Sequence, residues 1–306
     1  SVTETYYNTD FAETSVSGVQ AKTSIELTQL TIADFIATAS GSYYGYFPAI
    51  DTLYDSEYTL PGIRYDYFKQ GSGVAYDPYQ IDSEAHLVNM QRFIQSDYEN
   101  YKNKSYALAQ DIVLENEFFP IASYDFPFEG SFDGRYCTIY GLVINGGDYA
   151  ALFASTAEGA EITRVNLMPY EVSLGNFRGS VTGVNYVAGL VAFSEGKISK
   201  SSNRLTVTGV DYVGGITGRY DTSLGANPLP INECFNTGKV TGEHYVGGIA
   251  GFASGINNCF NAGQILGVEV TGGIVGSLNG TVINSYNSGE LRLHPSYSVG
   301  EYFGGI

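Results

Sequence analysis

Three histidines and a small set of acidic residues are the side chains whose type and spacing could support chemistry. His86, His244 and His294 are far apart in the sequence, and no His-Glu-x-x-His motif accompanies them. That motif places two zinc ligands and a general base on one helix face, so the sequence gives no indication of a zinc protease site. We expect His86 in a helix, His244 at a corner and His294 in a loop, each structural or solvated.

Acidic residues recur at one place in a repeated phrase. The residue before each copy is polar, and the five are Asn185, Asp211, His244, Glu269 and Glu301. Glycoside cleavage needs two carboxyl groups on opposite sides of the scissile bond. Here a single polar column has no second acidic column beside it, which favours a solvated corner. The sequence therefore predicts no enzyme activity; the alternative is a polysaccharide-active protein, or a glycan-binding one that uses exposed tyrosines.

A weak calcium site is the one metal-binding possibility. Asp51, Asp55 and Glu57 offer the carboxylate oxygens that Ca²⁺ prefers. A simple acidic linker explains the same residues and is favoured by the pattern. No other cofactor is predicted. The Gly-Gly phrases do not form a phosphate-binding loop, because no helix and no Lys-Ser/Thr pair follow them. We attribute those glycines to tight corners with positive φ or to close approach of neighbouring coils.

The elements that must position these residues are repeats. A phrase of the type Tyr-Val-Gly-Gly-Ile recurs, and its second glycine-type position falls at residues 189, 215, 248, 273 and 305. The steps between these positions are 26, 33, 25 and 32 residues, and the longer steps carry insertions at 221–230 and 294–298. A base period near 25 residues indicates a stacked repeat architecture.

Each repeat contains three short alternating runs separated by Gly and Asn. The runs are too short for helices and too close together for βαβ units. Stacking each run on its copy would bury a continuous core and form parallel ladders. The sequence therefore predicts an all-β, right-handed parallel β-helix, a solenoid with short capping helices. Ile216, Ile249 and Ile274 are expected to stack inside it.

Two cysteines occupy equivalent places in successive repeats. Cys234 and Cys259 should lie about 4.8 Å apart, one strand spacing, which permits a disulfide. The alternative, favoured here, is a ladder of small buried side chains. Asn203, Asn236, Asn261 and Asn287 form another column, which we expect to be a hydrogen-bonded turn ladder.

These motifs resemble the GLUG-repeat family of bacterial cell-surface and secreted proteins. Upstream phrases share the resemblance, including Phe128-Glu129-Gly130-Ser131-Phe132-Asp133-Gly134 and Tyr149-Ala150-Ala151-Leu152-Phe153, so that it covers roughly residues 70–306. Two residues depart from the repeat pattern: Leu205 stands where the other repeats have Gly, and Val270 stands where they have Tyr. The resemblance implies an extracellular location, cell-surface or secreted, and a structural or adhesin-like role.

Composition agrees with a solvated outer surface. The chain has 15 Lys and Arg against 32 Asp and Glu, a net charge of −17 at pH 7, with 38 Gly and 26 Tyr. Nucleic-acid affinity depends on neutralising phosphates, so the charge argues against nucleic acid as a partner. No apolar run approaches the length of a membrane span, and membrane insertion is not predicted.

The two ends of the sequence predict an assembly. Residues 1–50 resemble the end of a repeat domain, with a Tyr6-Tyr7-Asn8 strand and a capped helix at 23–39; residues 51–73 are a predicted linker and 74–306 the repeat domain. A second capping helix is expected near 82–96. We expect the first segment to complete another copy head to tail, forming filaments, with a longer tandem array or self-closure as alternatives. The predicted assembly residues are Tyr6, Tyr7, Ile25, Leu27, Phe303 and Ile306.

Overall fold

The computed structural model describes residues 6–8, 20–22, 67–221, 231–298 and 300–305. Contacts divide the chain into two units, Ser1–Pro61 and Gly62–Ile306. In the first unit, β1 (Tyr6–Asn8) pairs in parallel with β2 (Gln20–Lys22), and Tyr7 lies opposite Ala21. The helix predicted at 23–39 and the insertion at 222–230 lie outside the described residues.

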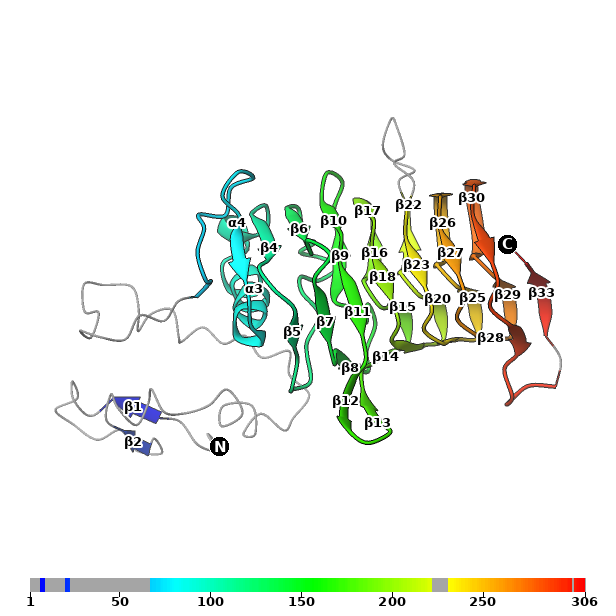
Figure 1. The fold of residues 1–306 in the computed structure, drawn as a ribbon, viewed down its shortest axis with the longest axis horizontal. Coiled ribbons are helices and arrows are strands. Elements are labelled where there is room, and N and C mark those ends of the chain that lie inside the picture. Colours follow the sequence, from blue (N-terminus) through cyan, green and yellow to red (C-terminus); the bar gives the residue numbers. More distant parts are fainter. Residues whose placement is uncertain (1–5, 9–19, 23–66, 222–230, 299, 306) are drawn as a thin grey trace. The chain divides into compact units, whose positions relative to one another are not determined.

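The second unit is a stack of rungs, where a rung is the set of strands contributed by one sequence repeat (Figure 1). Four sheets of 11, 7, 6 and 5 strands run along the stack. Within them every strand pairs in parallel with its copy in the neighbouring rung; Val240, for example, lies opposite Ile265, which lies opposite Leu291. The prediction of an all-β fold built from parallel sheets is confirmed.

The bounds of the strands follow the short alternating runs of the sequence. The 11-stranded sheet contains β3 (Tyr79–Ile81), β4 (Ser105–Leu108), β6 (Ser131–Asp133), β10 (Glu161–Thr163), β17 (Lys197–Ser199), β22 (Ile231–Asn232), β26 (Ala250–Asn257), β21 (Thr217–Tyr220), β16 (Val191–Ser194), β9 (Phe153–Thr156) and β30 (Val275–Ile283). The seven-stranded sheet contains β31 (Tyr286–Asn287), β27 (Phe260–Asn261), β23 (Phe235–Asn236), β18 (Ser202–Asn203), β11 (Asn166–Met168), β7 (Thr138–Tyr140) and β5 (Ile112–Val113). The six-stranded sheet contains β32 (Leu291–Leu293), β28 (Ile265–Gly267), β24 (Val240–Thr241), β19 (Thr206–Thr208), β14 (Ser180–Thr182) and β8 (Val143–Asn145). The five-stranded sheet contains β15 (Asn185–Ala188), β20 (Asp211–Gly214), β25 (His244–Gly247), β29 (Glu269–Gly272) and β33 (Glu301–Gly304).

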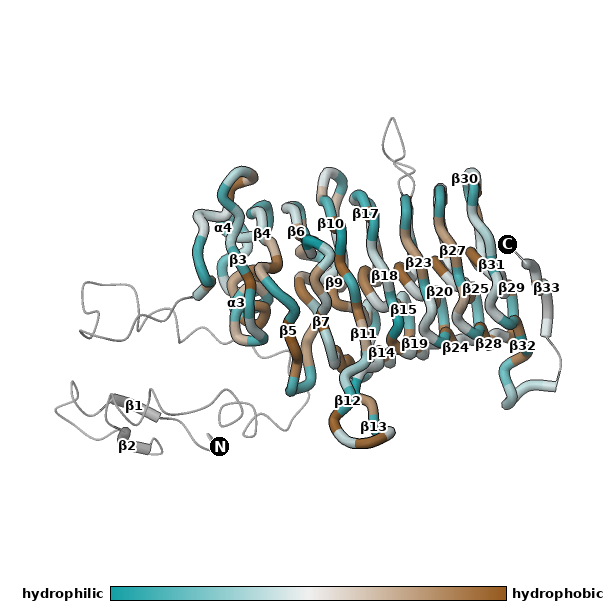
Figure 2. Tube along the Cα trace, in the orientation of Figure 1, coloured by the Kyte–Doolittle hydropathy of each residue, from teal (hydrophilic) through white to brown (hydrophobic). Residues whose placement is uncertain are grey.

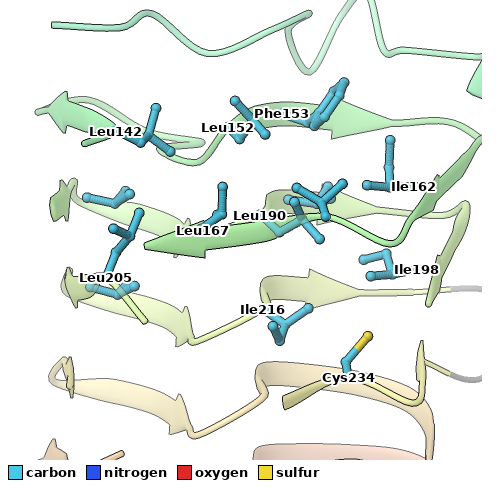
Figure 3. Close-up of a cluster of buried hydrophobic side chains, with 14 of the residues drawn as sticks. Leu142, Leu152, Phe153, Ile162, Leu167, Leu190, Ile198, Leu205, Ile216 and Cys234 are labelled. Atoms are coloured by element: carbon cyan, nitrogen blue, oxygen red, sulfur yellow. The ribbon is translucent and has the colours of Figure 1, made fainter. Parts of the chain in front are cut away.

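The core lies between these sheets and is made of the alternate, inward-facing residues. Ile216, Ile249 and Ile274 are fully buried, as predicted. Figure 3 shows Leu152, Leu190 and Ile216 following one another in successive rungs. Figure 2 shows the same periodicity, with hydrophobic colour recurring at equivalent places along the stack. Each rung therefore buries its apolar residues against the rungs before and after it.

A helix covers the first rungs at one end of the stack (Figure 1). This helix, α3 (Glu84–Ser96), begins at Ser83, whose hydroxyl accepts a hydrogen bond from the backbone N–H of His86. Its buried face contains Leu87, Met90, Gln91 and Ile94. The predicted capping helix near 82–96 is present. Phe93 lies beside that face, is half-buried and stacks on Tyr101, in the short α4 (Tyr98–Tyr101), at 4.8 Å.

Two local features differ from the sequence interpretation. The predicted linker extends to residue 73, yet Tyr67 and Phe68 already contact the aromatic ring of Phe93 on α3, at 5.1 and 5.9 Å. The folded part of the second unit therefore includes residues that we assigned to a linker, because aromatic side chains there find apolar partners. An antiparallel hairpin of β12 (Tyr170–Ser173) and β13 (Asn176–Arg178) also interrupts the parallel pattern.

Candidate functional site

The polar corner residues form one column, one residue for each rung. Asn185, Asp211, His244, Glu269 and Glu301 are paired in register along β15, β20, β25, β29 and β33. His244 Nδ1 and Glu269 Oε2 lie 3.1 Å apart and make an exposed ion pair or hydrogen bond. The arrangement is a solvent-facing polar ladder. His86 pairs with Asp82 at 2.9 Å, and the His294 ring contacts Tyr297. Each of the three histidines therefore has its own local partner, and they do not form a common site.

A second column beside that corner consists of stacked tyrosines. The rings of Tyr149, Tyr186, Tyr212 and Tyr245 follow one another at centroid distances of 4.9, 5.1 and 4.7 Å, with interplanar angles of 9°, 7° and 7°. Sugars stack on aromatic faces, and here each ring face between two neighbours is already covered. The column therefore offers ring edges to solvent, which favours a structural role over a glycan platform.

In the repeated phrases these tyrosines, and not the glycines that follow them, adopt the left-handed backbone conformation. Tyr186, Tyr212 and Tyr245 have φ values of 56°, 52° and 51°. Gly215 and Gly248 serve the other need that the sequence suggested, close approach. A Cβ on Gly215 would lie 2.4 Å from Asn236 Cγ, and one on Gly248 would lie 2.4 Å from Asn261 Cγ. The Gly-Gly phrases thus make room for an asparagine column.

That column is a continuous hydrogen-bonded ladder, as predicted. The side-chain Nδ2 of Asn203 donates to Asn236 Oδ1 at 2.9 Å, Asn236 donates to Asn261 at 2.8 Å, and Asn261 donates to Asn287 at 2.8 Å. Each Nδ2 also donates to the backbone carbonyl two residues later. The first three side chains are fully buried. The ladder is directional, because every inner member donates towards the next rung.

The last rung, defined here as β30, β31, β32 and β33, exposes positions that are buried in every earlier rung. Phe303 follows Val246 and Thr271 in an inward column; those two are 0% and 1% exposed, whereas Phe303 is 41% exposed. Leu278 follows Ala253 and is likewise 41% exposed against 0%. Among the described residues, each strand of this rung has neighbours on one side only. The surface combines unpaired backbone with apolar side chains, which is the character of an acceptor for another strand.

Two hollows lie near the opposite end of the second unit. A polar cleft of about 190 Å³ includes Asp133, Glu161 and Arg164 in its lining. Arg164 Nε donates to Asp133 Oδ1 at 2.9 Å, and Lys197 Nζ lies 2.6 Å from Glu161 Oε1, so both carboxylates are neutralised by ion pairs. A more open aromatic hollow of about 280 Å³ is lined by Tyr67, Phe68, Gln70, Gly71, Tyr79, Phe93 and Tyr101. The sequence analysis did not single out either hollow. The polar cleft lies over equivalent positions of β4, β6 and β10, whereas the aromatic hollow joins β3 to α3, α4 and the segment before β3.

The cysteine pair is a ladder of small core residues. Cys234 and Cys259 are both free thiols and 1% exposed. The backbone N–H of Cys234 donates to Cys259 Sγ at 3.3 Å. Burial raises the pKa of the Cys234 thiol, which keeps it protonated and unreactive. The structure thus follows the favoured alternative of the sequence analysis rather than the disulfide.

Several predicted site residues lie where the structure gives no side-chain description. Asp51, Asp55 and Glu57, the calcium candidates, are outside the described residues, as are the assembly residues Ile25, Leu27 and Ile306. Tyr6 and Tyr7 belong to β1, and Phe303 to β33. In the described ranges, no three His, Cys, Asp or Glu side chains gather as a metal site. No helix among these residues has the length and apolar character needed to cross a membrane.

Comparison with known proteins supports the fold. No family model matches the sequence, and no curated protein matches it. A solved structure with a similar fold is described as "a putative immunoglobulin A1 protease from Bacteroides ovatus". It has a TM-score of 0.60 and 19% sequence identity, and the match covers 78% of this chain and 86% of that one. At this identity the likeness shows a shared all-β architecture.

The match also corrects one expectation. We predicted that the chain is not an enzyme, and the described protease character of the similar structure contradicts that prediction. A single column of acids was too narrow a basis for it, because a stack of parallel sheets has other faces that can hold catalytic groups. The resemblance to GLUG repeats stays a prediction that no family model tests.

Proposed function

We propose that this chain is a repeat-built structural or adhesive module of an extracellular surface, whose copies associate head to tail through the last rung. The observation that carries the proposal is the exposure of inward-column residues such as Phe303 and Leu278 on a rung whose strand edges are unpaired. Monomeric proteins seldom leave an apolar surface and a sheet edge exposed together.

The finer description of the fold belongs to the same proposal. We infer that the rungs form a right-handed parallel β-helix of the GLUG type. Parallel crossover connections are right-handed in nearly all known cases. The recurrence of Tyr-Val-Gly-Gly-Ile and of the asparagine ladder supports the family resemblance, and a net charge of −17 with 26 tyrosines suits an outer surface.

Head-to-tail contact follows from the geometry of a stack with two different ends. At one end α3 packs its apolar face on the core, and at the other the last rung exposes its edge (Figure 1). A contact that joins two different surfaces does not close on itself, and its repetition generates filaments. A longer tandem array would cover the same surface with a rung of the same polypeptide. We assign no catalytic step to the residues of this contact.

Substitution of Phe303 tests the proposal. Phe303→Glu places a charge on the proposed contact and should shift the protein from assembled species to monomer. Leu174→Glu is the matched control, because Leu174 is 99% exposed on the β12–β13 hairpin, away from the last rung. Sedimentation velocity and electron microscopy measure the assembly. A parent protein that stays monomeric over the accessible concentration range would refute the proposal, as would equal assembly of Phe303→Glu and the parent.

A further inference from the structure

The asparagine ladder leaves one specific bonding capacity unused at the last rung. Asn203, Asn236 and Asn261 each donate two hydrogen bonds from Nδ2, one to a backbone carbonyl and one to the next asparagine. Asn287 Nδ2 donates to the carbonyl of Gly289 at 2.8 Å, and no described asparagine follows it. The ladder therefore presents an N–H donor where an acceptor of a further strand would fit.

An aromatic column beside the ladder ends in the same way. The rings of Phe235, Phe260 and Tyr286 stack at 5.0 and 5.5 Å, with interplanar angles of 2° and 9°. Phe235 and Phe260 are half-buried, whereas Tyr286 is 58% exposed. A strand that covers β31 would therefore be complementary if it carried two adjacent residues: an aromatic residue opposite Tyr286, followed by a hydrogen-bond acceptor opposite Asn287.

One described strand of this chain carries that pair of residues. The sequence of β1 is Tyr6-Tyr7-Asn8, which matches Ser285-Tyr286-Asn287 and Cys259-Phe260-Asn261 position by position. Its backbone is already extended, and it uses a parallel pairing with β2. A strand has two edges, so β1 can keep β2 on one side and accept another parallel strand on the other.

We propose that β1 of a second copy of this chain adds in parallel to β31, with Tyr7 opposite Tyr286 and Asn8 opposite Asn287. The inference rests on the proposed head-to-tail assembly and gives it a segment and a register. In this register Asn8 continues the asparagine column beyond Asn287, and Tyr7 continues the aromatic column beyond Tyr286. Tyr6 then takes the inward position of Ser285, in the column that contains Cys234 and Cys259.

Intermolecular cross-linking tests the register in the full chain. Strands in a sheet lie about 4.8 Å apart, within the range of about 4.4–6.8 Å that a disulfide spans between Cα atoms. The double variant Tyr7→Cys/Tyr286→Cys, treated with diamide, should form disulfide-linked multimers on a non-reducing gel. The matched control Tyr6→Cys/Tyr286→Cys puts one thiol on the opposite face of β1, and it should lose the cross-link.

The outcomes separate this inference from the proposed function. If the double variant assembles but does not cross-link, or if the control cross-links better, head-to-tail assembly remains supported. Either result would overturn the proposal that β1 is the added segment in the register that places Tyr7 opposite Tyr286. A cross-link confined to the monomer shows that β1 covers its own β31, which overturns the second copy as the occupant. A parent protein that does not assemble overturns both proposals.

Single substitutions at Asn8 check the ladder without touching β31. Asn8→Asp keeps an acceptor oxygen for Asn287 Nδ2, whereas Asn8→Leu removes it. A net hydrogen bond contributes about 0.5–1.5 kcal/mol, which corresponds to a weakening of association by up to about tenfold. We expect Asn8→Leu to weaken assembly by that factor, measured by sedimentation, and Asn8→Asp to retain it. Equal assembly of the two variants would overturn the role of the ladder.

Discussion

At the scale of single residues, the most informative side chains are the buried asparagines. Each satisfies backbone groups of its own turn and the amide of its neighbour, so a polar column runs through an apolar core at little cost. The glycines opposite them are required by contact, since a Cβ on Gly248 would overlap Asn261 Cγ at 2.4 Å. The ladder and the Gly-Gly phrases are therefore one structural device, repeated from rung to rung.

The ladder predicts a large loss of stability when one member is removed. Asn261 accepts from Asn236 Nδ2 and from the backbone N–H of Gly263, and it donates to Gly263 O and Asn287 Oδ1. Asn261→Leu would leave buried partners unsatisfied, each at about 1–3 kcal/mol, so the free energy of unfolding should fall by about 3 kcal/mol or more. Urea denaturation measures the change.

The control for that substitution is an exposed asparagine. Asn176 lies in the β12–β13 hairpin and donates a single exposed hydrogen bond, to Ser173 Oγ. Asn176→Ala should change stability by no more than about 0.5 kcal/mol. If Asn261→Leu is as mild as this control, the ladder does not stabilise the core.

At the scale of elements, the rung is the unit of structure. Its strands are only two to nine residues long, too short to be stable alone, and each gains its backbone partners and its apolar contacts from the neighbouring rungs. Among the described strands of the second unit, the β12–β13 hairpin is the exception, since its strands pair with each other and it exposes Val172 and Leu174. A destabilising substitution in one rung should therefore also destabilise the neighbouring rungs, whereas a substitution in the hairpin should have only a local effect.

A charge placed between two rungs tests this cooperativity. Ile249 is fully buried between Ile216 and Ile274, and Ile249→Asp would bury an unpaired carboxylate there. We expect a loss of several kcal/mol, on the order of 4 or more, in the free energy of unfolding. Val172→Asp, at a 58% exposed position, should melt within a few degrees of the parent. Thermal unfolding followed by circular dichroism compares them; similar melting of both variants would contradict the stacked register.

At the scale of the whole molecule, the second unit combines two different ends with a set of partly or fully buried tyrosines. Burial raises the pKa of Tyr98 to about 12, and also raises the pKa values of Tyr106, Tyr212 and Tyr220. The Tyr98 hydroxyl donates to the carbonyl of Pro127 at 2.7 Å, which requires its proton. These groups favour the protonated form in the folded state, so ionisation favours unfolding.

The raised pKa values predict a loss of stability in alkali. Unfolded tyrosines ionise near pH 10, so the stabilisation is fully present below that pH and is lost as the pH rises through about 12. The urea midpoint should fall over this window. Tyr98→Phe should flatten the fall, whereas Tyr76→Phe, at a position 92% exposed, should leave it unchanged. A midpoint independent of pH from 10 to 12 would contradict the prediction.

The sequence by itself determined the features that follow from repetition. Equal spacing places each residue beside its own copy one rung away, so the alignment of Ile216 with Ile249, and of Asn236 with Asn261, could be predicted from spacing alone. The same logic predicted the parallel sheets and the buried cysteine column. Helix α3 was predictable because its N-cap and apolar face are local signals.

Only the tertiary structure decided what depends on contacts between unlike parts. Positive φ falls on Tyr212 and not on the glycines that follow it, and nothing in the residue type signals that conformation. The Asp133–Arg164 pair joins positions in neighbouring rungs that do not correspond to each other, and Tyr67 contacts a helix distant in sequence. Periodicity relates a residue to its own copies, whereas these contacts are set by the packing of side chains that have no copies.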